Sequence, residues 1–197
     1  MIAKRLLDLC ISGIALILLI PFFVIISILI KLDSPGPIFF RQVRVGTGFK
    51  QFRIFKFRTM LTDAERRGTQ VSTSDDPRIT RAGWFLRKYK IDELPQLINV
   101  IIGDMSLVGP RPEVPRYVKV FRKDYEEILT VKPGITDFAS LEFKDENELL
   151  KASENPEQKY LSEILPAKID YYRKYLKEQS MYTDVKLILK TIWAIIR

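Results

Sequence analysis

The sequence predicts a mostly helical α+β protein in which an N-terminal re-entrant membrane helix precedes a small β-hairpin and amphipathic interfacial helices. Three observations lead to this fold class. A long run without charged side chains lies near the N-terminus, and two short segments rich in aromatic and β-branched residues follow it. Most of the remaining chain has apolar residues at helical spacing. We therefore divide the chain into a membrane anchor, residues 1–32, and a body, residues 33–197.

The predicted anchor is built on the uncharged run from Leu9 to Ile30. As a helix, these 22 residues would be roughly 33 Å long, about the thickness of the hydrocarbon core of a bilayer. A cleaved signal peptide is disfavoured, because the run is long and no small-residue cleavage site follows it. Positive charges at both ends, at Lys4 and Lys31, and the helix-breaking Pro21 favour a bent helix that enters and leaves on one face. A helix that crosses the bilayer is the alternative.

The body begins with a predicted β-hairpin. A turn at 33–37 ends the anchor, and the strands are expected at 38–40 and 52–57, with a glycine-containing connection at 45–48. Beyond the hairpin, we expect helices at residues 62–67, 79–89, 92–102, 114–129 and 183–197. The last of these has an apolar side and a basic side, as interfacial helices do, and a helix that faces the core is the alternative.

The composition restricts the chemistry. The net charge of +8 favours anionic partners. The sequence has no histidine and one cysteine, so histidine-dependent catalysis, histidine-ligated zinc and internal disulfides are excluded. No Walker motif or glycine-rich dinucleotide motif is present. No nucleic-acid-binding motif accompanies the positive charge, so nucleic acid is not a predicted partner.

The acid pair Asp92 and Glu93 provides the candidate catalytic residues. Asp92 is a good N-cap and Pro95 suits a first turn, so the pair is predicted to begin a helix. The positive end of a helix favours ionised carboxylates and phosphate, and an ionised aspartate can attack phosphorus. Taken alone, the dipeptide has a simpler interpretation, in which Asp92 only caps the helix and Glu93 is solvated.

Cations close to this pair in the sequence are candidates for phosphate binding. Arg87 precedes the pair, and Arg111 follows it between two prolines that stiffen its loop. Lys56 and Arg58 end the second strand, where a solvated strand edge is the alternative. Carboxylates and cations without histidine suit phosphoryl transfer assisted by Mg²⁺. Spacing does not choose among the candidate metal ligands, which are Asp76, Asp92, Glu93 and Asp104.

Several ordered segments resemble the bacterial sugar transferase family, the small monotopic phosphoglycosyl transferases also called undecaprenyl-phosphate sugar phosphotransferases. The resemblance covers nearly the whole chain. Its segments are KLDSPGPIFFRQ at 31–42, KFRTM at 56–60, DPRITR at 76–81, DELPQLINV at 92–100, GDMSLVGPRPE at 103–113 and KPGIT at 132–136.

The resemblance implies that Asp92 attacks the sugar-linked phosphate of a UDP-sugar and releases UMP. The phosphosugar on Asp92 would then pass to polyprenyl phosphate, while Glu93 supports the site through metal binding or activation of the acceptor phosphate. It further implies Mg²⁺ held by the acid pair, and phosphate binding by Lys56, Arg87 and Arg111. This reaction would be the first membrane step in the synthesis of exopolysaccharide, capsule, O-antigen or glycoprotein glycans.

The same resemblance implies a monotopic protein of the bacterial inner membrane. Pro21 would lie at the bend of a re-entrant helix, and the catalytic body would face the cytoplasm. Membrane lipids are expected partners, and a homodimer is left open. Many family members have GWAQV where this chain has DFASL at 137–141, a difference that bears on which sugar is used. A non-catalytic membrane scaffold is the alternative function, and it leaves the acid pair and the rigid Arg111 unexplained.

Overall fold

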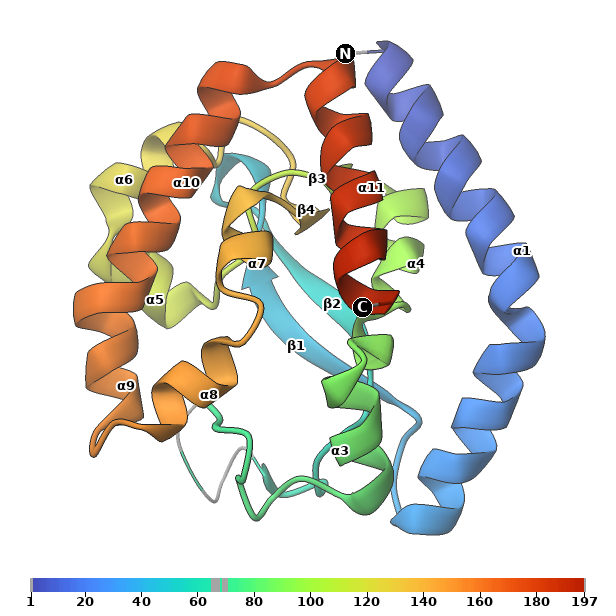
Figure 1. Ribbon diagram of the computed structural model, residues 1–197. Coiled ribbons are helices and arrows are strands. Elements are labelled where there is room, and N and C mark those ends of the chain that lie inside the picture. Colours follow the sequence, from blue (N-terminus) through green and yellow to red (C-terminus); the bar gives the residue numbers. More distant parts are fainter. Residues whose placement is uncertain (1, 65–67, 69–70, 197) are drawn as a thin grey trace.

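The computed structural model describes residues 2–64, 68 and 71–196, most of them in helices. The longest helix, α1 (Ile2–Asp33), runs along one side of the molecule for its whole length (Figure 1). The other α-helices form the body, and they are α3 (Arg81–Lys88), α4 (Gln96–Ile102), α5 (Pro115–Val120), α6 (Arg122–Ile128), α7 (Phe138–Glu142), α8 (Glu146–Lys151), α9 (Pro156–Lys159), α10 (Leu165–Glu178) and α11 (Met181–Ile196). The predicted mostly helical α+β class is confirmed.

The predicted hairpin is present as strands β1 (Phe39–Val45) and β2 (Gln51–Phe57), which pair antiparallel. A short 3-10 turn joins them, and its Gly48 has a positive φ of 61°, a conformation that glycine adopts without strain. The pattern did not predict a second, parallel pair, formed by β3 (Ser106–Val108) and β4 (Gly134–Thr136). Three-residue strands are too short to show a period of two.

One of the predicted helices is interrupted in the structure. The helix predicted at 114–129 is two helices, α5 and α6, separated at Phe121, whose φ of −105° and ψ of 35° are not helical. The buried residues Val118 and Tyr125 are seven positions apart on either side of this break. Seven residues make two helical turns, so the apolar period continues and does not reveal the interruption. The helix predicted at 62–67 falls partly on residues 65–67, outside the described part of the chain.

Most of α1 carries apolar side chains that the body does not cover. Within the described residues, α1 is the helix long and apolar enough to cross a membrane. Its outward side chains include Ile14, Ile17, Leu18, Val24, Ile25, Ile28, Leu29 and Leu32, each at least half exposed. Pro21 lies inside this continuous helix, and its role as the bend of a re-entrant segment stays a prediction.

The apolar residues of α11 are also exposed. Leu189 is 62% and Trp193 is 66% exposed, whereas few side chains of this helix, such as Leu187, are buried. The structure therefore disfavours the alternative of a purely core-facing helix at 183–197 and agrees with an interfacial one. On α3, Trp84 and Phe85 are about half exposed in the same way.

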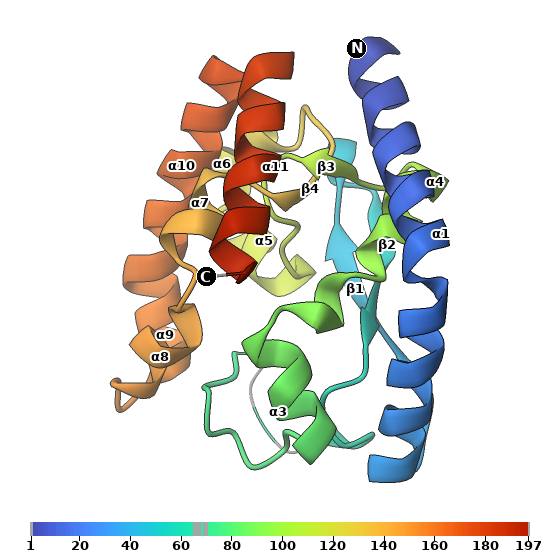
Figure 2. The same cartoon turned by 45° about the vertical axis from the view of Figure 1, so that its right-hand side comes forward.

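The beginning of α1 is held on the body by polar contacts. Lys4 donates to the carboxylate of Asp184 at 2.5 Å and to the hydroxyl of Tyr175 at 3.2 Å. The buried Asp8 accepts a hydrogen bond from the backbone N–H of Leu107 at 3.0 Å. The N-terminal turns of α1 are therefore bonded to α11 and to β3, and Figure 2 shows α4 beside α1.

The end of α1 is held by Arg58, which is 4% exposed. Its guanidinium donates to the backbone oxygen of Pro37 at 2.6 Å, and to the hydroxyl and backbone oxygen of Ser34 at 2.7 and 2.8 Å. Asp33 accepts from the N–H of Ala82 at 3.0 Å, which joins the same end to α3. Arg58 is therefore not part of a solvated strand edge but clamps the anchor to the hairpin.

Replacing Arg58 with methionine is expected to lower the free energy of unfolding by about 3 kcal/mol or more, because several buried acceptors lose their donor at once. Chemical denaturation in detergent micelles measures this difference. Arg53→Met is the control, since Arg53 lies on β2, the strand that precedes Arg58, and is exposed, and it should change stability by about 0.5 kcal/mol or less. Equal effects of the two substitutions would show that the clamp contributes nothing.

Candidate active site

Four of the predicted site residues come together where the hairpin meets the start of α4. β2 supplies Lys56, the 3-10 turn Ile91–Glu93 supplies the acid pair, and the loop after β3 supplies Arg111. Lys56 Nζ lies 2.8 Å from Glu93 Oε1, and Arg111 Nη1 lies 2.9 Å from Glu93 Oε2. A second bond joins Arg111 Nη2 to Glu93 Oε1. Glu93 is therefore the shared counter-ion of two cations.

The loop that carries Arg111 is fixed by backbone contacts. The N–H of Gly109 donates to Thr136 at 3.0 Å, and the N–H of Gly134 donates to Pro110 at 3.0 Å. The backbones approach so closely that a Cβ on either glycine would overlap the other chain segment. The prolines on both sides fix φ as well. This agrees with the stiff presentation of Arg111 that the sequence predicted.

Asp92 differs from Glu93 in having no partner. Its side chain is buried, with 8% exposure, and makes no hydrogen bond or ion pair with any residue that the structure describes. The prediction that it caps the following helix is wrong, since Pro95 occupies the N-cap position of α4 and Asp92 lies inside the preceding 3-10 turn. Lys90, which precedes this turn, has a left-handed φ of 55°, a strained conformation for a residue with a side chain.

Electrostatics assign the two acids different states. Burial raises the pKa of Asp92, against the opposing charge of Lys56. Burial also disfavours ionised Glu93, but Arg111 and Lys56 outweigh it and hold the pKa of Glu93 well below its usual range. Burial lowers the pKa of Lys56. Glu93 is thus an ionised carboxylate whose charge is balanced by Lys56 and Arg111, whereas Asp92 is desolvated and has no bonded cation among the described residues.

Arg87, the remaining predicted phosphate ligand, does not contact the acid pair directly. It donates to the hydroxyl of Ser72 at 2.5 Å. Its positive charge is nevertheless among those that oppose the rise in the pKa of Asp92, so Arg87 lies within electrostatic range of that acid. The structure therefore places Arg87 near the nucleophile candidate, without the direct bonds that Lys56 and Arg111 make.

Among the described residues, few acidic side chains are free to bind a metal ion. Asp76 is paired with Arg78 at 2.5 Å. No group of three or more acidic, histidine or cysteine side chains is placed to hold an ion within the described residues. Mg²⁺ commonly uses one or two carboxylates together with substrate phosphates. The free carboxylate of Asp92 fits that mode, whereas the oxygens of Glu93 already accept from two cations.

Two buried polar residues near the site were not predicted. Gln96 is fully buried, and neither polar atom of its carboxamide has a partner within the described chain. Asp137 is fully buried and caps α7 by accepting from the N–H of Ser140 at 2.6 Å. A polar residue next to the apolar Leu97 is the signal that could have drawn attention to Gln96. The unusual DFASL segment draws attention to Asp137, but the sequence does not predict that its side chain is buried.

The fold and the site define a membrane-associated domain whose charged centre suits anionic groups. The chain belongs to the bacterial sugar transferase family, whose sequence pattern matches residues 1–197. It is 39% identical over 202 residues to a UDP-N-acetylgalactosamine-undecaprenyl-phosphate N-acetylgalactosaminephosphotransferase of Aeromonas hydrophila, covering 98% of this chain and 43% of that protein.

Two further relatives give similar results. A UDP-glucose:undecaprenyl-phosphate glucose-1-phosphate transferase of Escherichia coli K12 is 34% identical, over 96% of this chain and 39% of that protein. A putative undecaprenyl-phosphate N-acetylgalactosaminyl 1-phosphate transferase of Bacillus subtilis is 46% identical over 121 residues, which are 61% of this chain and 68% of that protein. The chain thus spans about two fifths of the length of the Aeromonas and Escherichia relatives.

Proposed function

We propose that this chain transfers a sugar 1-phosphate from a UDP-sugar to undecaprenyl phosphate and releases UMP. The observation that carries the proposal is the division between the acids, since Asp92 is desolvated and unpaired whereas its neighbour Glu93 is neutralised by two cations. The substrate classes follow from the names of the relatives, which contain UDP-sugars and undecaprenyl phosphate.

The first proposed step is attack of an Asp92 oxygen on the sugar-linked phosphorus. The bond from this phosphorus to the bridging oxygen breaks, UMP leaves with the electron pair, and a phosphosugar is held on Asp92. In the second step an oxygen of the acceptor phosphate attacks the same phosphorus. The Asp92–phosphorus bond breaks, the sugar remains on a lipid diphosphate, and the carboxylate is restored.

The cations support both steps by neutralising charge on the phosphates. Lys56 and Arg111 are held in place by Glu93, and the Arg111 side chain keeps 28% exposure through which it can meet a phosphate. Preorganised cations of this kind act most strongly where water is excluded. Mg²⁺, when bound, would neutralise part of the diphosphate charge, and Asp92 would hold it together with the substrate phosphates.

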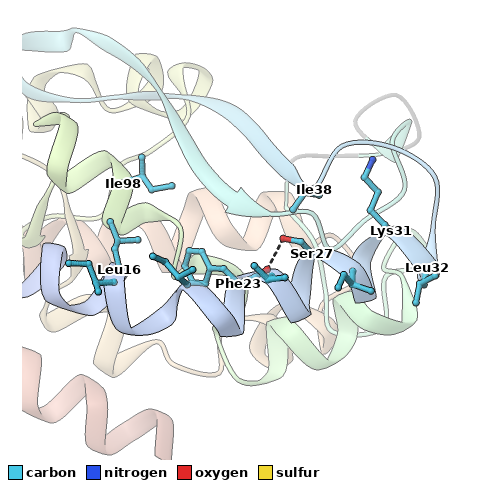
Figure 3. Close-up of a pocket in the computed structure, with 11 residues that line it drawn as sticks. Leu16, Phe23, Ser27, Lys31, Leu32, Ile38 and Ile98 are labelled. Atoms are coloured by element: carbon cyan, nitrogen blue, oxygen red, sulfur yellow. Dashed lines mark hydrogen bonds between the residues drawn. The ribbon is translucent and has the colours of Figure 1, made fainter.

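An apolar groove beside α1 is the proposed site of the acceptor's hydrocarbon chain. The groove has a volume of about 570 Å³, and Leu16, Phe23, Ile38 and Ile98 point into it (Figure 3). Phe23, Ile38 and Ile91, the residue before Asp92, all pack against the same buried apolar cluster. Apolar packing therefore links two residues that line the groove to the residue that precedes the catalytic acid.

Ile98→Trp is expected to fill part of the groove and raise the KM for the lipid acceptor by about tenfold. UMP release in the absence of acceptor should stay near the wild-type rate. Ile102→Trp is the control, because Ile102 lies on the same helix, is exposed and does not line the groove. An unchanged acceptor KM in Ile98→Trp would contradict this placement.

We further propose that the protein inserts into one face of the membrane, with the body on the cytoplasmic side. Both ends of α1 are bonded to the same body, through Lys4 and Asp8 at the beginning and Asp33 at the end. A helix whose two ends contact one polar body does not have those ends on opposite sides of a bilayer. This favours the re-entrant alternative over the spanning one.

The test of the proposed function is nucleotide release. Purified protein is incubated with a panel of UDP-sugars, Mg²⁺ and undecaprenyl phosphate, and UMP and UDP are quantified separately. Lipid-dependent formation of UMP with at least one donor is expected, and the active donor identifies the sugar. Formation of UDP instead would indicate ordinary glycosyl transfer and would overturn the proposal.

A further inference from the structure

The carboxamide of Gln96 is a buried polar group without a partner. Gln96 has 0% exposure, and both its Nε2 and its Oε1 lack a hydrogen bond within the described residues. Buried side-chain amides in native proteins are nearly always bonded, so an unbonded one calls for an explanation. Asp92, the other polar side chain without a partner at this site, lies four residues earlier.

The backbone brings these two side chains to neighbouring positions. Leu94 and Pro95, which separate the 3-10 turn from α4, both have right-handed helical φ and ψ values. Gln96 therefore follows Asp92 by about one helical turn, a spacing at which side chains lie roughly 5–6 Å apart at Cβ. A glutamine side chain is long enough to span that separation.

The other side-chain amide of α4, that of Asn99, has a structural role. Asn99 accepts from the N–H of Phe55 at 2.8 Å and donates to the backbone oxygen of Arg53 at 3.0 Å. These two bonds fasten α4 to β2. Gln96 makes no such bond, so the attachment of the helix does not depend on it.

Glu93, the other acid within one turn of Gln96, is already engaged. Its two oxygens accept three hydrogen bonds from Lys56 and Arg111. No hydrogen bond from a described residue occupies the acceptor positions of Asp92, so Asp92 is the acid to which an amide N–H at this position would donate.

We propose that Gln96 is a positioning residue for Asp92: its amide N–H donates to one oxygen of the Asp92 carboxylate once substrate is bound, and the other oxygen faces the phosphorus. Being fully buried, Gln96 acts through Asp92 and not by touching the substrate. The inference rests on the proposed function, in which Asp92 is the nucleophile. In the resting state the amide is unbonded. This lowers the stability of the protein but leaves the amide available to the Asp92 carboxylate when substrate binds.

Gln96→Met separates this role from a structural one, because methionine has a similar length and no amide. The rate of UMP release before acceptor is added should fall roughly 10- to 100-fold, since the Asp92 carboxylate is no longer held in the orientation for attack. The KM for the donor should stay within about twofold, because the amide does not touch the donor. The melting temperature should not fall, because no hydrogen bond of the resting structure is removed.

Ser12→Ala is the matched control, since the hydroxyl of Ser12 in α1 is also buried and without a partner in the described chain. It should leave both melting temperature and activity near wild type. An unchanged rate in Gln96→Met would overturn the inference, as would a rate loss that only accompanies a lower melting temperature. Wild-type protein that releases no UMP would instead contradict the proposed function, so the two failures are distinguishable.

Discussion

Asp92→Asn is expected to lower lipid-dependent UMP release by roughly a thousandfold or more, because a neutral amide cannot form the bond to phosphorus. The fold should be retained, since the Asp92 carboxylate makes no hydrogen bond or ion pair with the described residues that the substitution would remove. The measurement is the steady-state rate of UMP formation, together with the melting temperature of the same preparation.

Asp145→Asn is the control for this substitution, because Asp145 is exposed and makes no side-chain cap bond at the start of α8. It should retain wild-type activity. If Asp92→Asn stayed active while Glu93→Gln abolished UMP release, Glu93 would be the nucleophile and the assignment of the two acids would be reversed.

Arg111→Met is expected to have the second-largest effect, lowering kcat/KM by about 100- to 1000-fold. The substitution removes both bidentate bonds to Glu93 and leaves that partly buried carboxylate with Lys56 alone. The free energy of unfolding should also fall by about 2 kcal/mol, less than for a fully buried pair because Arg111 is partly exposed. UDP-sugar titrations and chemical denaturation measure the two effects.

Two further variants test whether the loss of activity in Arg111→Met is specific to this arginine and to its bidentate geometry. Arg111→Lys keeps the charge but not the bidentate geometry, so its activity should be intermediate. Arg116→Met should be nearly silent, since Arg116 pairs with Glu157 at the surface with 61% of its side chain exposed. Activity of Arg111→Met equal to that of Arg116→Met would show that the loop arginine does not bind phosphate.

The sequence predicts the main parts of the fold and the composition of the site. The apolar run follows from composition, the hairpin from two segments rich in aromatic and β-branched residues, and the end of α4 from Gly103, which has a φ of 101° in the structure. Lys56 and Arg111 were expected at a phosphate site with the acid pair, and the structure brings them onto Glu93.

The parts that the sequence does not predict depend on contacts between distant segments. The parallel pairing of β3 with β4 is a contact between short segments that lack a period of their own. The buried role of Arg58 requires knowing that residues 30–37 fold back over β2. Asp92 and Glu93 differ in state because Lys56 and Arg111 bond to Glu93 and not to Asp92. The sequence of the dipeptide does not predict which acid the cations bind.

The most direct test of the account is the mass of the protein after reaction with donor alone. Protein is incubated with its active UDP-sugar in the absence of lipid acceptor, quenched, and analysed by intact mass and peptide mapping. The account predicts an added sugar phosphate on the peptide containing Asp92, absent from Asp92→Asn and removed by undecaprenyl phosphate. Lipid-dependent UMP release without any adduct, or an adduct on another residue, would contradict it.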